Sequence, residues 1–377
     1  MIVLGIETSC DETAIALVKK EADKISVLAN IVSSQIELHA AWGGVVPNLA
    51  AREHLKNILP VLKSALKKAG KKMDDIDLIA VTQGPGLIPA LLIGTNFAKT
   101  LSYVWQKPLL GIHHIEGHIF ANFIKDKIGA STKSQETISK QDTKEEIKFP
   151  ALALVVSGGH TQLVLMTDYF KYEIIGETQD DAVGEAFDKV ARLLGLGYPG
   201  GPIISNLADV YSKSEKNRTI KFPRPMLGSG DFNFSFSGLK TAVLYTVKKF
   251  IETNNLNEKE KLPDEFIQET AYEFQEAATD VLIHKTIKAG LKYGAKTIFL
   301  AGGVSANKNL RDKLGLAVKE KIPTANYILQ PINYSTDNAA MIAVTGIYRW
   351  EKMSAKEKED SLWTWKTLQT NAQIILK

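Results

Sequence analysis

Two distant stretches of this sequence share one pattern: VLGIETSCDETAIALV at residues 3–18 and ALALVVSGGHTQLVLM at residues 151–166. Each is an apolar run, a short polar turn and a second apolar run, which predicts a β-hairpin with a polar tip. Each is followed by a strand, a glycine turn and a helix, LIAVTQGPGLIPALLIG from Leu78 and TIFLAGGVSANKNLRDKL from Thr297. The repeated order predicts a duplicated α/β fold of two lobes, with a ligand cleft between them.

This repeat also sets the expected domain boundaries. We assign residues 1–124 to an N-terminal lobe and residues 149–345 to a C-terminal lobe. Residues 125–148 between them are charged and contain no aromatic residue, which is typical of a solvated loop or insertion. Residues 346–377 are charged and then aromatic, and we expect this tail to form a helix that packs back on the N-terminal lobe.

Composition limits the class of protein. A chain of 377 residues with 45% hydrophobic content can bury a core in each of two lobes. The single cysteine, Cys10, excludes an intrachain disulfide and fits a reducing compartment. The first residues resemble no targeting leader and no apolar run is long enough to span a membrane, so we expect a cytoplasmic protein without membrane association.

The net charge of +4 is too small to indicate nucleic-acid binding by itself, but its distribution is uneven. Residues 210–250 interleave basic residues with phenylalanines, a combination that suits phosphates and unpaired bases. This region is a candidate RNA-contacting surface. In the alternative interpretation, its phenylalanines belong to the core and its lysines to an ordinary solvated face. The residues are Lys213, Lys216, Arg218, Lys221, Arg224, Lys240, Lys248 and Lys249, with Phe222, Phe232, Phe234 and Phe236.

A cluster of histidines occurs in GIHHIEGHIF, residues 111–120. On a helix His114 and His118 would lie one turn apart on one face, close enough to bind one metal ion. The alternative is that they are structural histidines among the surrounding isoleucines. A zinc protease is disfavoured because Glu116 lies midway between the histidines, where it would point away from the metal.

Three glycine turns are candidates for binding a phosphate. GLGYPG at residues 195–200 matches a dinucleotide motif in letters only, because it follows a helical pattern and contains Pro199. The turns SGGHT from Ser157 and AGGVSAN from Ala301 are better placed for a nucleotide. At the first hairpin tip, Asp11 and Glu12 could hold Mg²⁺, act as a general base, or simply satisfy the turn.

Taken together, these motifs resemble the tRNA N6-adenosine threonylcarbamoyltransferase family, once described as glycoproteases. The resemblance runs from Gly5 to about Ala343 and implies an actin-like fold of the sugar kinase and heat-shock ATPase type. It also implies transfer of a threonylcarbamoyl group from threonylcarbamoyl-adenylate to N6 of adenosine 37, in tRNAs that read codons starting with A, with release of AMP. The motifs, in order, are IETSCDET, AWGGVVPNLAAREH, GPGLIPALLIG, HHIEGH, SGGHTQL, GEAFDKVARLLGLGYPGGP, FSFSGLKTA, AGGVSANKNLR and STDNAAMIA.

The resemblance further implies a set of site residues. The metal ligands would be His114, His118 and Asp337, holding one divalent ion per subunit, Fe²⁺ in the usual family description with Zn²⁺ and Mg²⁺ as alternatives. The adenylate contacts would be Val156, Ser157, Gly158, Gly159, His160, Asp188, Gly201 and Asn307. We expect Asp11 or Glu12 to accept the N6 proton. Ala339 departs from the family, which usually has glycine there.

The expected partners are tRNA, contacted at its anticodon loop, and, for a member of bacterial type, an inactive paralogue and a small ATPase. Three other functions compete with the transferase. A small-molecule kinase or ATPase of the same fold would leave the histidines idle, a nucleotide-binding scaffold would lack transfer activity, and a metalloprotease would cleave protein without tRNA.

Overall fold

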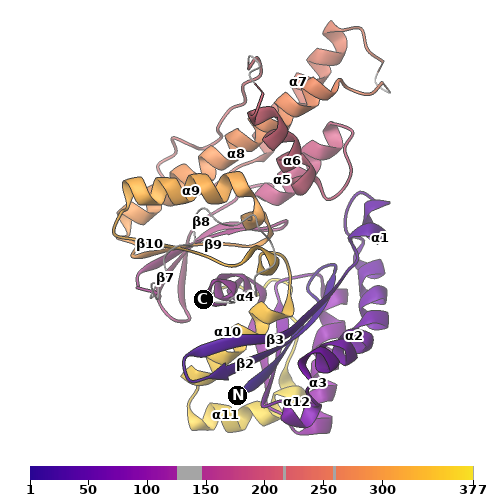
Figure 1. Cartoon of the computed structure of the whole chain (residues 1–377), viewed down its shortest axis with the longest axis vertical. Helices are drawn as coiled ribbons and strands as arrows, with labels where there is room; N and C mark the ends of the chain where they lie inside the picture. The colour runs from indigo at the N-terminus through magenta and orange to yellow at the C-terminus, as the bar shows by residue number, and fades with distance from the viewer. Residues whose placement is uncertain (125–146, 215–217, 258–259, 377) are drawn as a thin grey trace.

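The computed structural model describes residues 1–124, 147–214, 218–257 and 260–376, and it forms two α/β lobes (Figure 1). Most of the expected insertion, residues 125–146, therefore lies outside the described residues. None of the helices in the described ranges combines the length and apolar character that a bilayer crossing needs.

The two lobes contain sheets of the same topology. The N-terminal sheet has the order β3 (Lys24–Ser34), β2 (Glu12–Glu21), β1 (Ile2–Glu7), β4 (Leu78–Gly84) and β5 (Leu109–His113). The C-terminal sheet has the order β8 (Lys171–Glu177), β7 (Thr161–Asp168), β6 (Ala151–Val156), β9 (Thr297–Ala301) and β10 (Asn326–Leu329). In each, the first two pairings are antiparallel and the last two parallel. Both predicted hairpins and the duplicated two-lobe fold are confirmed.

Helices cover the outer face of each sheet. The N-terminal lobe has α1 (Ile36–Ala40), α2 (Pro47–Ala69) and α3 (Ile88–Trp105). The C-terminal lobe has α5 (Val183–Leu193), α6 (Gly200–Ser212), α7 (Ser237–Thr253), α8 (Asp264–Lys292) and α9 (Lys308–Lys321). Short 3₁₀ helices are η1 (Met73–Asp75), η2 (Ala121–Phe123), η3 (Gly303–Ala306) and η4 (Ile332–Tyr334).

Two further helices lie between the sheets, α4 (His114–Phe120) and α10 (Ala339–Lys352) (Figure 1). Side chains alternate across a strand, so the central strands serve two cores at once. In β1, Leu4 and Ile6 face α2 and α3, whereas Val3 belongs to the core around α4 and α10. That central core includes residues of both sheets, and it joins the two lobes into one packed body.

The close approach of α10 to β1 depends on Gly5. A Cβ built on Gly5 would collide with the carbonyl oxygen of Ala339 and lie 2.9 Å from the backbone nitrogen of Ala343. Both neighbours are backbone atoms, so only movement of the helix could relieve the overlap. Glycine is therefore required on β1 where α10 begins.

We expect Gly5→Ala to lower the free energy of unfolding by about 3 kcal/mol, because overpacking at a rigid contact costs up to about that much. Urea denaturation followed by circular dichroism would measure the loss. The matched control is Gly238→Ala on α7, where the added methyl meets no atom within 4 Å. Equal stability of the two variants would contradict the requirement.

The segment after α10 runs along the N-terminal lobe through α11 (Ala355–Asp360), η5 (Ser361–Trp363) and α12 (Thr364–Thr367). Trp365 lies against Tyr103 of α3, with ring centroids 4.7 Å apart. Lys99 Nζ donates to the carbonyl oxygen of Leu368 at 3.0 Å, and Leu368 is buried in the outer core of this lobe. The proposed domain boundary at residue 345 falls inside α10, so we retain it only as a division of the sequence.

Candidate metal centre

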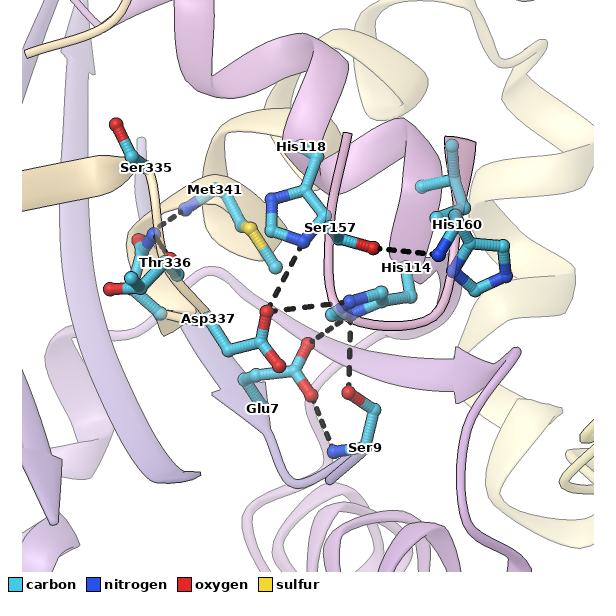
Figure 2. Close-up of polar contacts among 12 residues, drawn as sticks. Glu7, Ser9, His114, His118, Ser157, His160, Ser335, Thr336, Asp337 and Met341 are labelled. Carbon is cyan, nitrogen blue, oxygen red and sulfur yellow. Dashed lines mark hydrogen bonds and ion pairs between the residues drawn. The ribbon is translucent and has the colours of Figure 1, made fainter. Parts of the chain in front are cut away.

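Helix α4 places His114 and His118 one turn apart, with ring centroids separated by 4.6 Å. Asp337, in the loop before α10, points at both rings (Figure 2). Its Oδ1 lies 3.5 Å from Nε2 of His114 and 3.2 Å from Nε2 of His118. One ligand atom from each of the three residues fits within a span of 4.8 Å. The three side chains can therefore bind a single ion.

A fourth residue, Glu7, fixes the orientation of His114. Glu7 is fully buried at the end of β1, and its Oε2 lies 3.0 Å from Nδ1 of His114. Because a carboxylate only accepts, Nδ1 carries the proton and Nε2 keeps its lone pair for a metal. Thr82 Oγ1 and the backbone N–H of Ser9 also donate to Glu7. One signal of this role is visible in the sequence, a charged residue at the end of an otherwise apolar strand.

The surroundings of these residues fit a cation. Both ring nitrogens of His118 are buried; Nδ1 has no hydrogen-bond partner among the described residues, and the only contact given for Nε2 is the one with Asp337. Burial opposes the charge on His114, but Asp337 and Glu7 outweigh it and raise the pKa of His114 to about 9. Burial likewise opposes the charge on Asp337, yet His114 and His118 lower its pKa to about 2. Two imidazoles and a carboxylate are a donor set for a transition metal.

We expect Glu7→Gln to weaken metal binding about 10- to 100-fold, because residues that orient a ligating histidine typically contribute that much. Glutamine keeps the size of the side chain but can present its N–H₂ group to Nδ1 of His114, which favours the wrong tautomer. Metal content after dialysis against graded chelator, measured by mass spectrometry, gives the affinity. Glu53→Gln on α2 is a carboxylate control outside the site. Retention of metal equal to that of the wild type would remove Glu7 from this role.

The other polar residues of the histidine motif have structural partners. His113 precedes α4, and its Nδ1 accepts the backbone N–H of Ile115 at 3.2 Å. Glu116 is buried and binds Arg349, whose Nε lies 3.1 Å from Oε2. It therefore faces away from the two ligands, as the sequence predicts, and is not placed to act as a protease base.

The turn from Ser157 to His160 joins β6 to β7 beside the metal centre (Figure 2). Its conformation is fixed by two hydrogen bonds, from His160 N to Ser157 Oγ at 3.1 Å and from Ser157 N to the His160 carbonyl at 2.8 Å. Gly158 and Gly159 are exposed, and a Cβ on either would meet open space. The structure thus brings this turn next to His114 with its backbone open to a ligand, whereas the last strand residue, Val156, is buried.

The remaining candidate adenylate contacts lie on helices of the C-terminal lobe. Asp188 on α5 accepts the backbone N–H of Gly200 at 2.7 Å, at the start of α6. Burial raises the pKa of Asp188 despite this bond. Asn307 caps α9 by accepting from Leu310 N, and its Nδ2 donates to Gln275 Oε1 at 2.7 Å. The side chains of Asp188 and Asn307 therefore stabilise the starts of α6 and α9. A Cβ on Gly201 would meet open space.

Asp11 and Glu12 stand at the tip of the first hairpin. Burial, followed by the carboxylates of Asp337 and Asp11, raises the pKa of Glu12 well above its usual value. Ser34 Oγ donates to Glu12 Oε1 at 3.2 Å. Sequence reasoning overlooked Tyr198, whose pKa is raised by burial and then by Asp11 and Asp188.

The candidate RNA-contacting surface at residues 210–250 needs a correction. The four phenylalanines named for it are buried, with exposed fractions of 0–5%, because they pack in the core of the C-terminal lobe, and they are not available to stack on bases. Among the described basic residues of this region, five are exposed, and one of them, Lys213, binds Asp209 at 2.6 Å. The five are Lys213, Arg218, Lys221, Lys248 and Lys249. Lys216 lies outside the described residues.

Comparison with known proteins identifies relatives along most of the sequence. The sequence model of the family described as tRNA N6-adenosine threonylcarbamoyltransferase matches residues 26–344. A protein of that name from Persephonella marina is 48% identical over 355 residues, which is 93% of this chain and 91% of the relative. Another from Thermosipho melanesiensis is 49% identical over 347 residues, covering 92% of this chain and 94% of the relative.

Solved structures support the fold alone. HypF from T. kodakarensis superposes on 99% of this chain with a TM-score of 0.55 and 12% identity. Full-length HypF in its phosphate- and nucleotide-bound form superposes on 94% with a TM-score of 0.53 and 12% identity. This chain spans about half the length of each, 49% and 47% respectively.

Proposed function

This chain belongs to the tRNA N6-adenosine threonylcarbamoyltransferase family, and from that premise we propose which donor, which acceptor and which residues it uses. The donor is threonylcarbamoyl-adenylate, and the acceptor is N6 of adenosine 37 in tRNAs that read codons starting with A. The bond from N6 to the carbamoyl carbon forms, the bond from that carbon to the phosphate oxygen breaks, AMP leaves, and N6 loses one proton. The observation that carries this proposal is the arrangement of His114, His118 and Asp337 around one point.

We propose Fe²⁺ as the metal, held by those three residues. Two histidines and one carboxylate with open positions are typical of non-haem iron sites, zinc accepts the same donors, and Mg²⁺ prefers oxygen ligands. When bound, the ion supplies Lewis-acid stabilisation of charge on the donor's oxygens. Glu7 holds the proton on Nδ1 of His114, so that the imidazole remains a neutral ligand.

The residues of this chain have three further tasks in the proposal. The turn from Ser157 to His160 offers backbone N–H groups to the charge that develops on the donor, and its exposed glycines allow close approach. Asp188, Gly201 and Asn307 form the wall that receives the nucleoside. The adenine amine is a poor nucleophile because its lone pair is delocalised, so orientation of both reactants contributes much of the acceleration.

The proton of N6 goes to Glu12 or Asp11. Both stand at the tip of the first hairpin near Asp337, which supports a place beside the reacting carbon. The raised pKa of Glu12 makes its carboxylate a stronger base than an ordinary glutamate.

We propose that the tRNA is bound at its anticodon loop, whose bases are already unpaired. Exposed cations of the C-terminal lobe, such as Lys213, Arg218 and Lys221, would contact its phosphates. An inactive paralogue and a small ATPase are the proposed protein partners, and the tRNA substrate together with the single cysteine supports a cytoplasmic location.

The test is transfer of labelled threonylcarbamate from its adenylate to an unmodified tRNA, with partner proteins supplied. We expect label on the tRNA and one AMP released per group transferred. A transcript with guanosine at position 37 is the matched control and should remain unlabelled. Label that fails to reach tRNA in the complete mixture would reject the proposed reaction.

A further inference from the structure

A cavity of about 410 Å³ is bordered by His160, and none of its other lining residues has a role in the function proposed above. Its walls come from β7 and β8 of the C-terminal lobe, from the start of α4, and from the segment Ala372–Leu376. Its volume falls within the roughly 300–1,000 Å³ of small-molecule sites. His113 and Ile115 at its inner end are buried, whereas Glu177 and Gln373 at its rim are exposed.

Contacts far apart in the sequence hold the segment Ala372–Leu376 against the site. The backbone N–H of Asn371 donates to the carbonyl oxygen of Gln83 at 3.0 Å. The Nδ1 of His113 accepts a hydrogen bond from Ile115 N, so its Nε2 is the donor to the carbonyl oxygen of Ile374 at 3.1 Å. Leu376 is buried in the core shared with α4 and β7. His113, the first histidine of the HHIEGH motif, thus fixes this wall of the cavity.

The lining selects against an anion. No lysine or arginine is present among the described residues that line the cavity, and Glu177 adds a negative charge. A phosphate or the carboxylate of a threonyl group would therefore be repelled rather than bound. Ile115, Ile174 and Ile374 line the cavity together with Gln162, and aliphatic surface beside one amide suits a flat, uncharged ring with a hydrogen-bonding edge.

The inner end of the cavity borders the metal centre. His160 lines the cavity and stands beside His114 in the close-up (Figure 2). A ring seated there would bring one edge next to the centre while its faces lie against the aliphatic walls. The other proposed adenylate contacts, Asp188, Gly201 and Asn307, lie on α5, on α6 and at the start of α9, and none of them lines the cavity.

We propose that this cavity receives the adenine base of the acceptor, displaced from the anticodon loop, with Gln162 at its hydrogen-bonding edge and the segment Ala372–Leu376 as its outer wall. The inference rests on the proposed function, because it identifies where the acceptor of that reaction lies. An amide can pair with the N6 and N7 edge of adenine, and unpaired RNA bases are commonly displayed in this way to a protein.

Ala372→Trp tests the proposal by filling the cavity from its outer wall. We expect kcat/KM for tRNA to fall at least 10-fold, while metal content and AMP binding stay at the wild-type level. The matched control is Ala355→Trp, an exposed alanine at the start of α11 that lines no part of the cavity. Gln162→Ala, which adds no bulk, should raise KM for tRNA several-fold and serves if the tryptophan variant does not fold.

A second measurement reports on the base itself. An anticodon stem-loop with 2-aminopurine at position 37 should change in fluorescence on binding to the wild-type chain, as the base leaves its stack. With Ala372→Trp the stem-loop should still bind, but without that change.

The possible results separate the two proposals. If the wild type does not transfer, the proposed function fails. If it transfers and both Ala372→Trp and Gln162→Ala leave the tRNA kinetics unchanged, only the cavity assignment fails. If these variants raise KM for the adenylate but not for tRNA, the cavity binds the donor and the assignment to the acceptor base is overturned.

Discussion

Replacing both His114 and His118 by alanine is expected to abolish transfer of threonylcarbamate to tRNA. The loss should be about a thousand-fold or more, because a bound metal supplies several kcal/mol of charge stabilisation and each 1.4 kcal/mol is a factor of ten in rate. Asp337 alone would remain, and a single carboxylate does not hold a divalent ion of this class tightly. Metal analysis and single-turnover transfer by the same preparation measure both effects.

The control is His284→Ala, which removes an exposed histidine of α8. Circular dichroism and thermal unfolding would establish that the double variant is folded, since both histidines are buried. Transfer at the wild-type rate by a folded, metal-free double variant would keep the reaction but return the two histidines to a structural role.

Glu12→Gln is expected to lower kcat by about 10²–10⁴, the usual contribution of a general base, with little change in KM for the adenylate. Glutamine retains the hydrogen bond from Ser34 Oγ but cannot take a proton from N6. Single-turnover rates with saturating tRNA and adenylate isolate the chemical step.

The comparison variants are Asp11→Asn and Glu21→Gln. Glu21 ends the same strand but is exposed, so its substitution should leave the rate unchanged. A loss confined to Asp11→Asn would assign the proton to that neighbour. Near-normal rates in both Glu12→Gln and Asp11→Asn would exclude the hairpin tip from proton transfer.

Local patterns predicted much of this molecule. The two hairpins are visible because apolar runs with polar tips occur twice, and the pair of histidines is visible because four residues make one helical turn. These features need only neighbours in the chain. They were sufficient for the two sheets and for two of the three residues around the centre.

Contacts between residues far apart in the sequence were harder to predict. Asp337 is far from His118 in the sequence, and only the family resemblance suggested it. Glu7 looks like the end of a strand until His114 is placed beside it. The phenylalanines around Phe234 show the same limit, because their spacing left open whether they face the core or the solvent. Tertiary packing decides these cases, and it is not encoded within a short window of sequence.

The position of α10 affects how the protein folds while it is synthesised on the ribosome. The inner faces of β1 and β2 are covered by a helix that is translated more than 300 residues later. At a translation rate of about 5–20 residues per second, that apolar surface stays without α10 for roughly 15–60 s. Chaperones that shelter nascent chains therefore have a clear target in the first hairpin. The metal centre, which needs Asp337 just ahead of α10, is assembled at nearly the same late moment.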